Sequence, residues 1–180
     1  NMTSIIKVNT IQDAGGNAIM TSNGSGTLTL NNAALKATPA FEAHSNTDQT
    51  ISNNAYTKVS LQTEIFDTDS KYDNSTYRFT PTIAGKYFVY GSARFQAEDS
   101  QMNFGQTAIY KNGSIYAERM IDFRGNNGTQ MSVDISVIID MDSDDYVELF
   151  GKIFRGGSGN IKIETDNKST NFGAYRIIGA

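Results

Sequence analysis

The sequence predicts an all-β protein built as an antiparallel sandwich or barrel. The 180-residue chain is rich in Thr, Tyr, Phe, Val and Ile, and it holds 16 glycines but only two prolines. No stretch repeats its apolar residues with the 3.6-residue period of a helix. Instead, short strand-like runs follow one another at regular spacing and are separated by turn residues.

Residues 1–36 differ from the rest of the chain. They contain no aromatic residue, and glycine-rich turns break them into short pieces. Their apolar residues are too few for a separate core: Ile5, Val8, Ile11, Ile19, Leu28 and Leu30. We therefore expect several copies to bury these residues against one another, or against another protein. Residues 1–36 are predicted to be an attachment or trimerisation segment, and residues 37–180 the main domain.

The strand signals are regular from Pro39 onward. A short strand over 77–80 ends at Pro81, and a long, largely apolar strand follows over 85–95. Strands over 106–111 and 114–119 flank Asn112-Gly113, the strongest hairpin signal in the chain.

The remaining strands are predicted from alternation and from β-favouring residues. Over 131–139, apolar residues at the odd positions alternate with mainly polar ones, which indicates a strand with one buried face. Strands over 146–154, 161–163 and 172–178 complete the series. Antiparallel strands at this spacing are typical of a sandwich or barrel.

Five motifs in this region fall in the order seen in C1q-like domains. They are FTP at 79–81, AGKYFV at 84–89, YKNG at 110–113, DYVEL at 145–149 and FGAY at 172–175. On these motifs, residues 38–180 resemble a C1q-like domain. The resemblance implies a ten-stranded antiparallel jelly roll, shared with the tumour necrosis factor family, that assembles as a compact homotrimer.

The N-terminal segment carries a second, shorter resemblance. Residues 6–13, IKVNTIQD, are similar to the start of many tail and fibre proteins of marine bacteriophages. This similarity implies a virion location, in which residues 1–36 bind other virion proteins. The chain would then be a tail-fibre, tip or decoration protein on the particle surface.

Apolar side chains beyond those needed for the core predict a trimer interface. Several occupy the strand face opposite the core residues, and aromatic residues are enriched at interfaces. The candidates are Phe41, Phe88, Tyr90, Ile138, Phe150 and Tyr175. The alternative is that these side chains only cover the outer face of the sandwich.

The connections between strands predict two unlike ends of the domain. One end has tight turns, and the N-terminal segment leaves from it; the other has long polar loops over 45–55, 98–102, 124–130 and 155–169. Long loops on a rigid scaffold are a common place for binding. Candidates for hydrogen bonding to a host glycan or protein are Arg124, Asn126, Asn127, Arg155 and Ser158. The alternative is that these loops are only solvated.

Three acidic residues have a spacing at which oxygen ligands can hold calcium: Asp140, Asp142 and Asp144. Some C1q-like trimers bind calcium, so a calcium cofactor is one interpretation. However, an EF-hand loop starting at Asp140 would need Gly at its sixth position and Glu at its twelfth, where Asp145 and Gly151 stand. We favour a solvated hairpin turn.

The composition disfavours several classes of function. The net charge is −4, so no overall basic field attracts nucleic acid. The chain has no cysteine and one histidine, His44, which leaves no thiol chemistry and no site made of several histidines. No apolar run approaches the roughly 20 residues that cross a bilayer. No grouping of base, nucleophile or metal ligands indicates an enzyme.

Two functions remain as hypotheses. The first is a non-enzymatic, homotrimeric virion protein that contacts the host surface through its loop-rich end and gains avidity from many copies. The second is a secreted C1q-like module that recognises glycans or cell-surface proteins. Lys7 follows Ile5-Ile6 at once, so no apolar signal-peptide core forms, which favours the first hypothesis.

Overall fold

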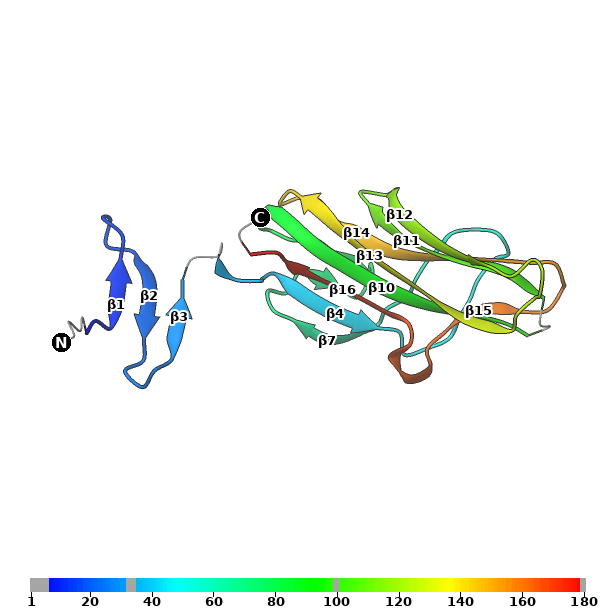
Figure 1. Ribbon diagram of the computed structural model, residues 1–180, viewed down its shortest axis with the longest axis horizontal. Coiled ribbons are helices and arrows are strands. Elements are labelled where there is room, and N and C mark those ends of the chain that lie inside the picture. The colour runs from blue at the N-terminus through cyan, green and yellow to red at the C-terminus, as the bar shows by residue number, and fades with distance from the viewer. Residues whose placement is uncertain (1–6, 32–34, 99–100, 179–180) are drawn as a thin grey trace, which may run out of the picture.

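A computed structural model describes residues 7–31, 35–98 and 101–178. These residues form a small N-terminal sheet and two larger sheets that pack face to face as a sandwich (Figure 1). Ile5 and Ile6 of the N-terminal segment lie outside the described residues. Among the described residues, no helix is long and apolar enough to cross a membrane.

The N-terminal sheet has three antiparallel strands in the order β1 (Thr10–Gln12), β2 (Ala18–Ser22) and β3 (Leu28–Leu30). The Asp13 carboxylate organises the first turn by accepting hydrogen bonds from the backbone N–H groups of Gly15 and Asn17, at 2.8 and 2.9 Å. Such side-chain-to-backbone bonds are the usual reason for aspartate in turns. The first strand of the sandwich begins at Ala40.

The first sheet of the sandwich is built around its longest strand, and we call it the β10 sheet. β10 (Gly85–Ala97) pairs along almost its whole length with β13 (Gln130–Met141). Its other edge pairs with β16 (Asn171–Arg176) and β15 (Ile161–Glu164), which continue to the outer strands. Those outer strands are β4 (Ala40–His44), β7 (Thr63–Asp67) and β5 (Gln49–Thr50).

The second sheet, which we call the β14 sheet, runs in the order β12-β11-β14-β9-β8. Its long strands are β11 (Met102–Lys111), β12 (Ser114–Asp122) and β14 (Val147–Arg155). Its short ones are β6 (Thr57–Lys58), β8 (Tyr72–Asp73) and β9 (Arg78–Phe79). A 3-10 turn, η2 (Asp166–Lys168), precedes β16.

The predicted all-β antiparallel architecture is confirmed, and so are its clearest local signals. The odd positions of β13 face the core, although Val137 is only half-buried. The even positions are all exposed, and Ile138 is the one large apolar residue among them. Asn112 and Gly113 both have positive φ, of 52° and 79°, as a two-residue type I′ hairpin turn requires.

The core lies between the two sheets and includes a stack of aromatic rings at its centre. The Phe41 ring stacks between Tyr72 and Phe79, with centroid distances of 4.7 and 4.6 Å, and meets the edge of Phe172 at 5.2 Å. The Tyr72 hydroxyl donates a 2.8 Å hydrogen bond to the Leu61 carbonyl, which satisfies the polar group among these rings. The two-sheet sandwich, which we call the head, therefore has a hydrophobic core made by one chain.

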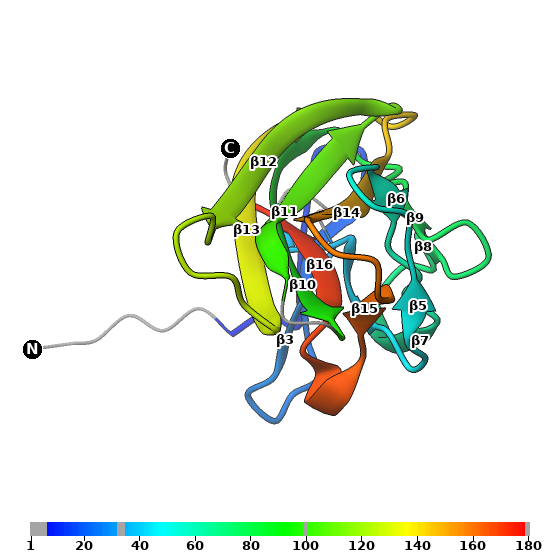
Figure 2. The same ribbon diagram turned by 90° about the vertical axis from the view of Figure 1, so that its right-hand side faces the viewer.

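The strand registers place the loops at two opposite ends. Gly85 pairs with Met141 and Ala40 pairs with Tyr175, so the start of the sandwich and its last strand's exit share the tight-turn end. At the other end, Met102 pairs with Arg155 and Gln96 with Gln130. Figure 2 looks onto this second, loop-rich end of the head.

Candidate functional site

The outer face of the β10 sheet carries a row of uncovered apolar side chains. Phe88 is in register with Ile138 on one neighbouring strand and with Tyr175 on the other. The Phe88 and Tyr175 rings lie 5.4 Å apart. Ile138 is 55% exposed and Tyr175 43% exposed. Because a sheet face in water normally carries polar residues, this row is a candidate interface.

The next row on the same face is partly polar and tightly packed. Tyr90 is in register with Gly173, and its ring lies so close to Gly173 that a Cβ at this position would overlap it. The Tyr90 hydroxyl donates a 3.2 Å hydrogen bond to Glu42 on β4. Burial, together with the Glu42 carboxylate, raises the pKa of Tyr90 to about 12. Glycine at 173 therefore allows the tyrosine to lie flat across the sheet.

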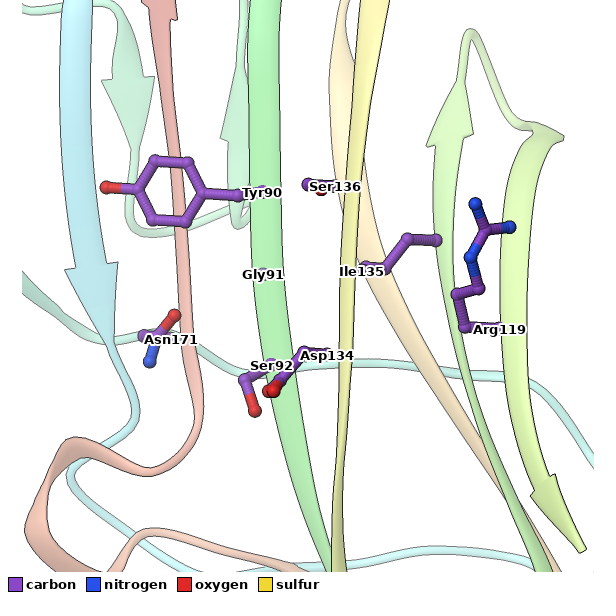
Figure 3. Close-up of a pocket in the computed structure, with 8 residues that line it drawn as sticks. All are labelled: Tyr90, Gly91, Ser92, Arg119, Asp134, Ile135, Ser136 and Asn171. Carbon is purple, nitrogen blue, oxygen red and sulfur yellow. The ribbon is translucent and has the colours of Figure 1, made fainter.

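A shallow pocket of about 410 Å³ opens beside Tyr90 (Figure 3). The row of Asp134, Ser92 and Asn171 crosses its floor, and Arg119 of β12 forms another part of its lining. These groups offer hydrogen-bond donors and acceptors rather than apolar surface. The outer face thus changes from apolar near the tight-turn end to polar toward the loop-rich end.

The structure brings four of the six predicted interface residues together on this face: Phe88, Tyr90, Ile138 and Tyr175. Phe41 is a correction, because its side chain is fully buried between the sheets. Along β4 the outward positions are Ala40, Glu42 and His44, and this alternation points Phe41 inward.

Phe150 is a second correction to the predicted group. It lies on the outer face of the β14 sheet, on the other side of the sandwich, where it stacks on Tyr110 at 3.9 Å. Tyr110 in turn meets the edge of Tyr56 at 5.9 Å. Phe150 is therefore packed within its own protomer and is separated from the Phe88 row by the core.

The edge strand β12 presents further apolar side chains that the predicted group did not include. Ile115 and Tyr116 are about half exposed, and so is Met120. The Tyr116 hydroxyl donates a 3.4 Å hydrogen bond to the Ile138 carbonyl, so this edge adjoins the Phe88 row. Two adjacent apolar pairs in the sequence, Ile115-Tyr116 and Met120-Ile121, were the available signal, because strict alternation would leave one member of each pair on the solvent side.

The loop-rich end is tied together by hydrogen bonds between its loops. The backbone carbonyl of Gln101 accepts a 3.2 Å hydrogen bond from the Gly156 N–H. The side-chain oxygen of Gln101 accepts a 3.0 Å hydrogen bond from the side-chain amide of Asn127. The Asn127 side-chain oxygen accepts from the Asn103 amide at 2.9 Å. Three loops distant in sequence therefore form one preorganised tip.

The predicted binding residues occupy different positions in this tip. Asn126 and Ser158 are exposed, and Arg124 is exposed but ion-paired with Asp122. Hydrogen bonding from Arg124 lowers the pKa of Asp122. Arg155 is a correction, because it is buried and its backbone N–H donates to Asn53 at 3.0 Å. Arg155 is the last residue of β14 and continues its alternating series of buried positions, which explains this burial.

The acidic triplet does not come together as a metal site. Asp140 pairs with Lys86 at 3.1 Å, whereas Asp142 and Asp144 are exposed in the following turn. Asp145 accepts hydrogen bonds from Lys111 and from the Asp142 N–H, which overcome its partial burial and lower its pKa to about 2. Within residues 7–31, 35–98 and 101–178, no three Asp, Glu or His side chains form a group that could hold a metal ion.

Solved structures with the same fold are C1q and tumour necrosis factor jelly rolls. The globular domain of zebrafish complement 1qA matches with a TM-score of 0.54 and 14% identity, covering 77% of this chain and 96% of that one. Murine APRIL gives 0.58 and 10%, covering 77% and 98%. Eiger TNF from S. frugiperda gives 0.59 and 11%, covering 78% and 93%. The head therefore has the C1q/TNF-like jelly-roll fold.

Sequence comparison adds one curated relative. No family model matches the chain. The uncharacterized protein YqcC of Bacillus subtilis (strain 168) is 26% identical over 127 residues, which cover 68% of this chain and 34% of that protein. The chain thus spans about a third of the length of this relative.

Proposed function

We propose that this chain is a non-enzymatic, homotrimeric structural protein of a phage virion, a tail-fibre, tip or decoration protein. Its jelly-roll head trimerises through the outer face of the β10 sheet, and its loop-rich end contacts the host surface. Residues 1–36 join the head to other virion proteins. The row of Phe88, Ile138 and Tyr175 carries the trimer part of this proposal, because it is an apolar sheet face that the described residues of the protomer leave uncovered. The virion part rests on the similarity of residues 6–13 to phage tail and fibre proteins.

A closed ring of three subunits needs two different complementary surfaces on each copy. The head offers them side by side: the Phe88 row on the sheet face, and the apolar edge strand β12 next to it. A stable interface of standard size buries about 800 Å² per partner and is rich in aromatic residues. The polar row below supplies hydrogen-bonding groups for the rim.

The host-contact part of the proposal rests on the preorganised tip. Three tips on one trimer, and many trimers on one particle, raise avidity by about two to four orders of magnitude without a strong single site. Asn126 and Ser158 are exposed there, next to loops that the Asn127 side chain ties together. The second candidate function is a secreted C1q-like module that uses the same tip to recognise glycans or cell-surface proteins.

Light scattering coupled to size exclusion tests the assembly. We expect about 59 kDa, three times the 19.7 kDa chain, for residues 1–180 and a trimer also for a chain starting at Ala37. A monomer in both cases would overturn the trimer. Gold-labelled antibodies against the head, applied to purified phage particles, test the virion location. Labelling of the particles is expected, and labelling confined to the bacterial surface would favour the secreted module.

A further inference from the structure

The two faces of the N-terminal sheet are chemically unlike. Ile11, Met20 and Leu30 are directly in register across the three strands, so they form one continuous aliphatic row. The register one residue away joins Thr10, Thr21 and Thr29. Successive residues of a strand point to opposite faces, so Ile11, Met20 and Leu30 lie on one side, the aliphatic face. The other side, which we call the threonine face, carries the threonine row and also Ile19, which is 37% exposed.

The aliphatic face is open to solvent in the single chain. Leu28, two residues before Leu30 and on the same face, is 60% exposed, and Ile11 is 47% exposed. A groove of about 160 Å³ is lined by Ile11, Met20 and Leu28, together with Ser22 and residues 8–10. A three-stranded sheet gains its stability by covering its hydrophobic face, so this one requires an apolar partner.

The uncharged, aliphatic side chains of this face indicate what kind of surface would cover it. The three strands contain no charged residue, so the face offers no charge for recognising a charged protein. The aliphatic side chains of this face line a groove together with Val8 and with the polar residues Asn9, Thr10 and Ser22. Another copy of this face provides both the side chains that fill such a groove and a groove that receives them.

Residues 31–39 connect the N-terminal sheet to the head, and this connection is short enough to hold three sheets near one another in a head trimer. Residues 31–39 span at most about 35 Å when extended. They enter the head at Ala40, which is in register with Tyr175 on the proposed trimer face. In a head trimer, the three links therefore begin beside the interface, and their short length holds the three sheets at high effective concentration.

We propose that the aliphatic faces of three N-terminal sheets pack against one another on the axis of the trimer and form a small closed stalk. This proposal rests on the homotrimeric head of the proposed function. The occupant of the Ile11–Met20–Leu30 face is thus the same face of the other two copies. The threonine face, with Thr10, Thr21 and Thr29, points outward and is the surface left for other virion proteins.

Cross-linking at two adjacent residues of the central strand tests this arrangement. The chain has no cysteine, so Met20→Cys and Thr21→Cys each introduce a single thiol, on opposite faces of β2. Packed sheets lie about 10 Å apart, which is too far for a disulfide, so a short bismaleimide is the probe. We expect covalent dimers in the Met20→Cys full-chain trimer, at least tenfold more than in the Thr21→Cys trimer.

The outcomes separate the stalk from the head. Equal cross-linking of both variants, or none in either, within an intact 59 kDa trimer overturns the stalk and leaves the head trimer standing. Selective cross-linking of Met20→Cys in a chain whose head face has been disrupted supports the stalk while contradicting a head-driven trimer. Monomers without cross-links overturn both. Circular dichroism of each variant, matched to the unmodified chain, verifies that the head is folded.

Discussion

The two outer faces of the head both carry aromatic rings, but the rings differ in how far neighbouring side chains cover them. On the β14 sheet, Phe150 stacks on Tyr110 at 3.9 Å, and the Lys152 ammonium lies 4.7 Å from the Tyr56 ring. On the β10 sheet, Ile138 is 55% exposed, and Tyr175 is 43% exposed although its ring lies 5.4 Å from that of Phe88. The number of aromatic residues in a strand therefore does not identify an interface; what matters is whether the protomer covers them.

Charge reinforces this difference. Glu148 of the β14 sheet is buried, yet its carboxylate is paired with Lys58 at 2.6 Å and with Arg78 at 3.0 Å. The Arg78 guanidinium also lies 3.7 Å from the Tyr146 ring. These charged groups of the β14 sheet are paired within the protomer, whereas the Phe88 row leaves apolar side chains exposed to water.

The largest expected effect comes from placing charge on the uncovered face. Ile138→Asp combined with Tyr175→Ser is expected to convert the head trimer into a 19.7 kDa monomer, because an unpaired carboxylate in an interface costs several kcal/mol. Both side chains are exposed in the protomer, so its free energy of unfolding is expected to change by less than about 1 kcal/mol. Light scattering and urea unfolding measure the two quantities.

The matched control lies on the opposite face. Phe150→Ser removes a stacked ring and is expected to lower the free energy of unfolding by about 1–2 kcal/mol, while the trimer persists. Loss of the trimer in Phe150→Ser, or its survival in the Ile138 and Tyr175 variant, would contradict the assignment of the two faces.

A smaller effect is expected where the Tyr90 ring crosses Gly173. Gly173→Ala forces the ring away from the sheet and is expected to destabilise the protomer by about 1–3 kcal/mol. In a Tyr90→Ala background the added methyl group meets no ring, so its cost is expected to fall by at least half. A double-mutant cycle of urea unfolding measures this coupling; additive effects would show that the two residues do not touch.

The smallest expected effect is a pH dependence of the same tyrosine. Burial and Glu42 raise the pKa of Tyr90 from 10.0 to about 12. The folded state therefore holds this proton more tightly, so the contribution is complete below pH 10 and is lost as the pH rises to 12. The stability advantage of the unmodified chain over Tyr90→Phe, about 1 kcal/mol, is expected to shrink over this range. An advantage that stays constant in urea unfolding would disprove the linkage.

Much of the head could be predicted from local patterns. The alternation over 131–139 identified the buried face of β13, and Asn112-Gly113 identified the hairpin, because both depend on residues that are neighbours in the chain. The candidate surfaces were predicted less completely. Phe88, Tyr90, Ile138 and Tyr175 do share one outer face, and their role as an interface stays a prediction. Phe41, Phe150 and Arg155 lie elsewhere than predicted, and the apolar edge of β12 was missed.

The sequence by itself determined that this protein is made of antiparallel strands with one buried face each, since strand periodicity is a local property. Only the tertiary structure decided which outward side chains stay uncovered. Phe41 is enclosed by Tyr72, Phe79 and Phe172, which come from three other strands. Burial is a property of such distant neighbours, and no local pattern contains them.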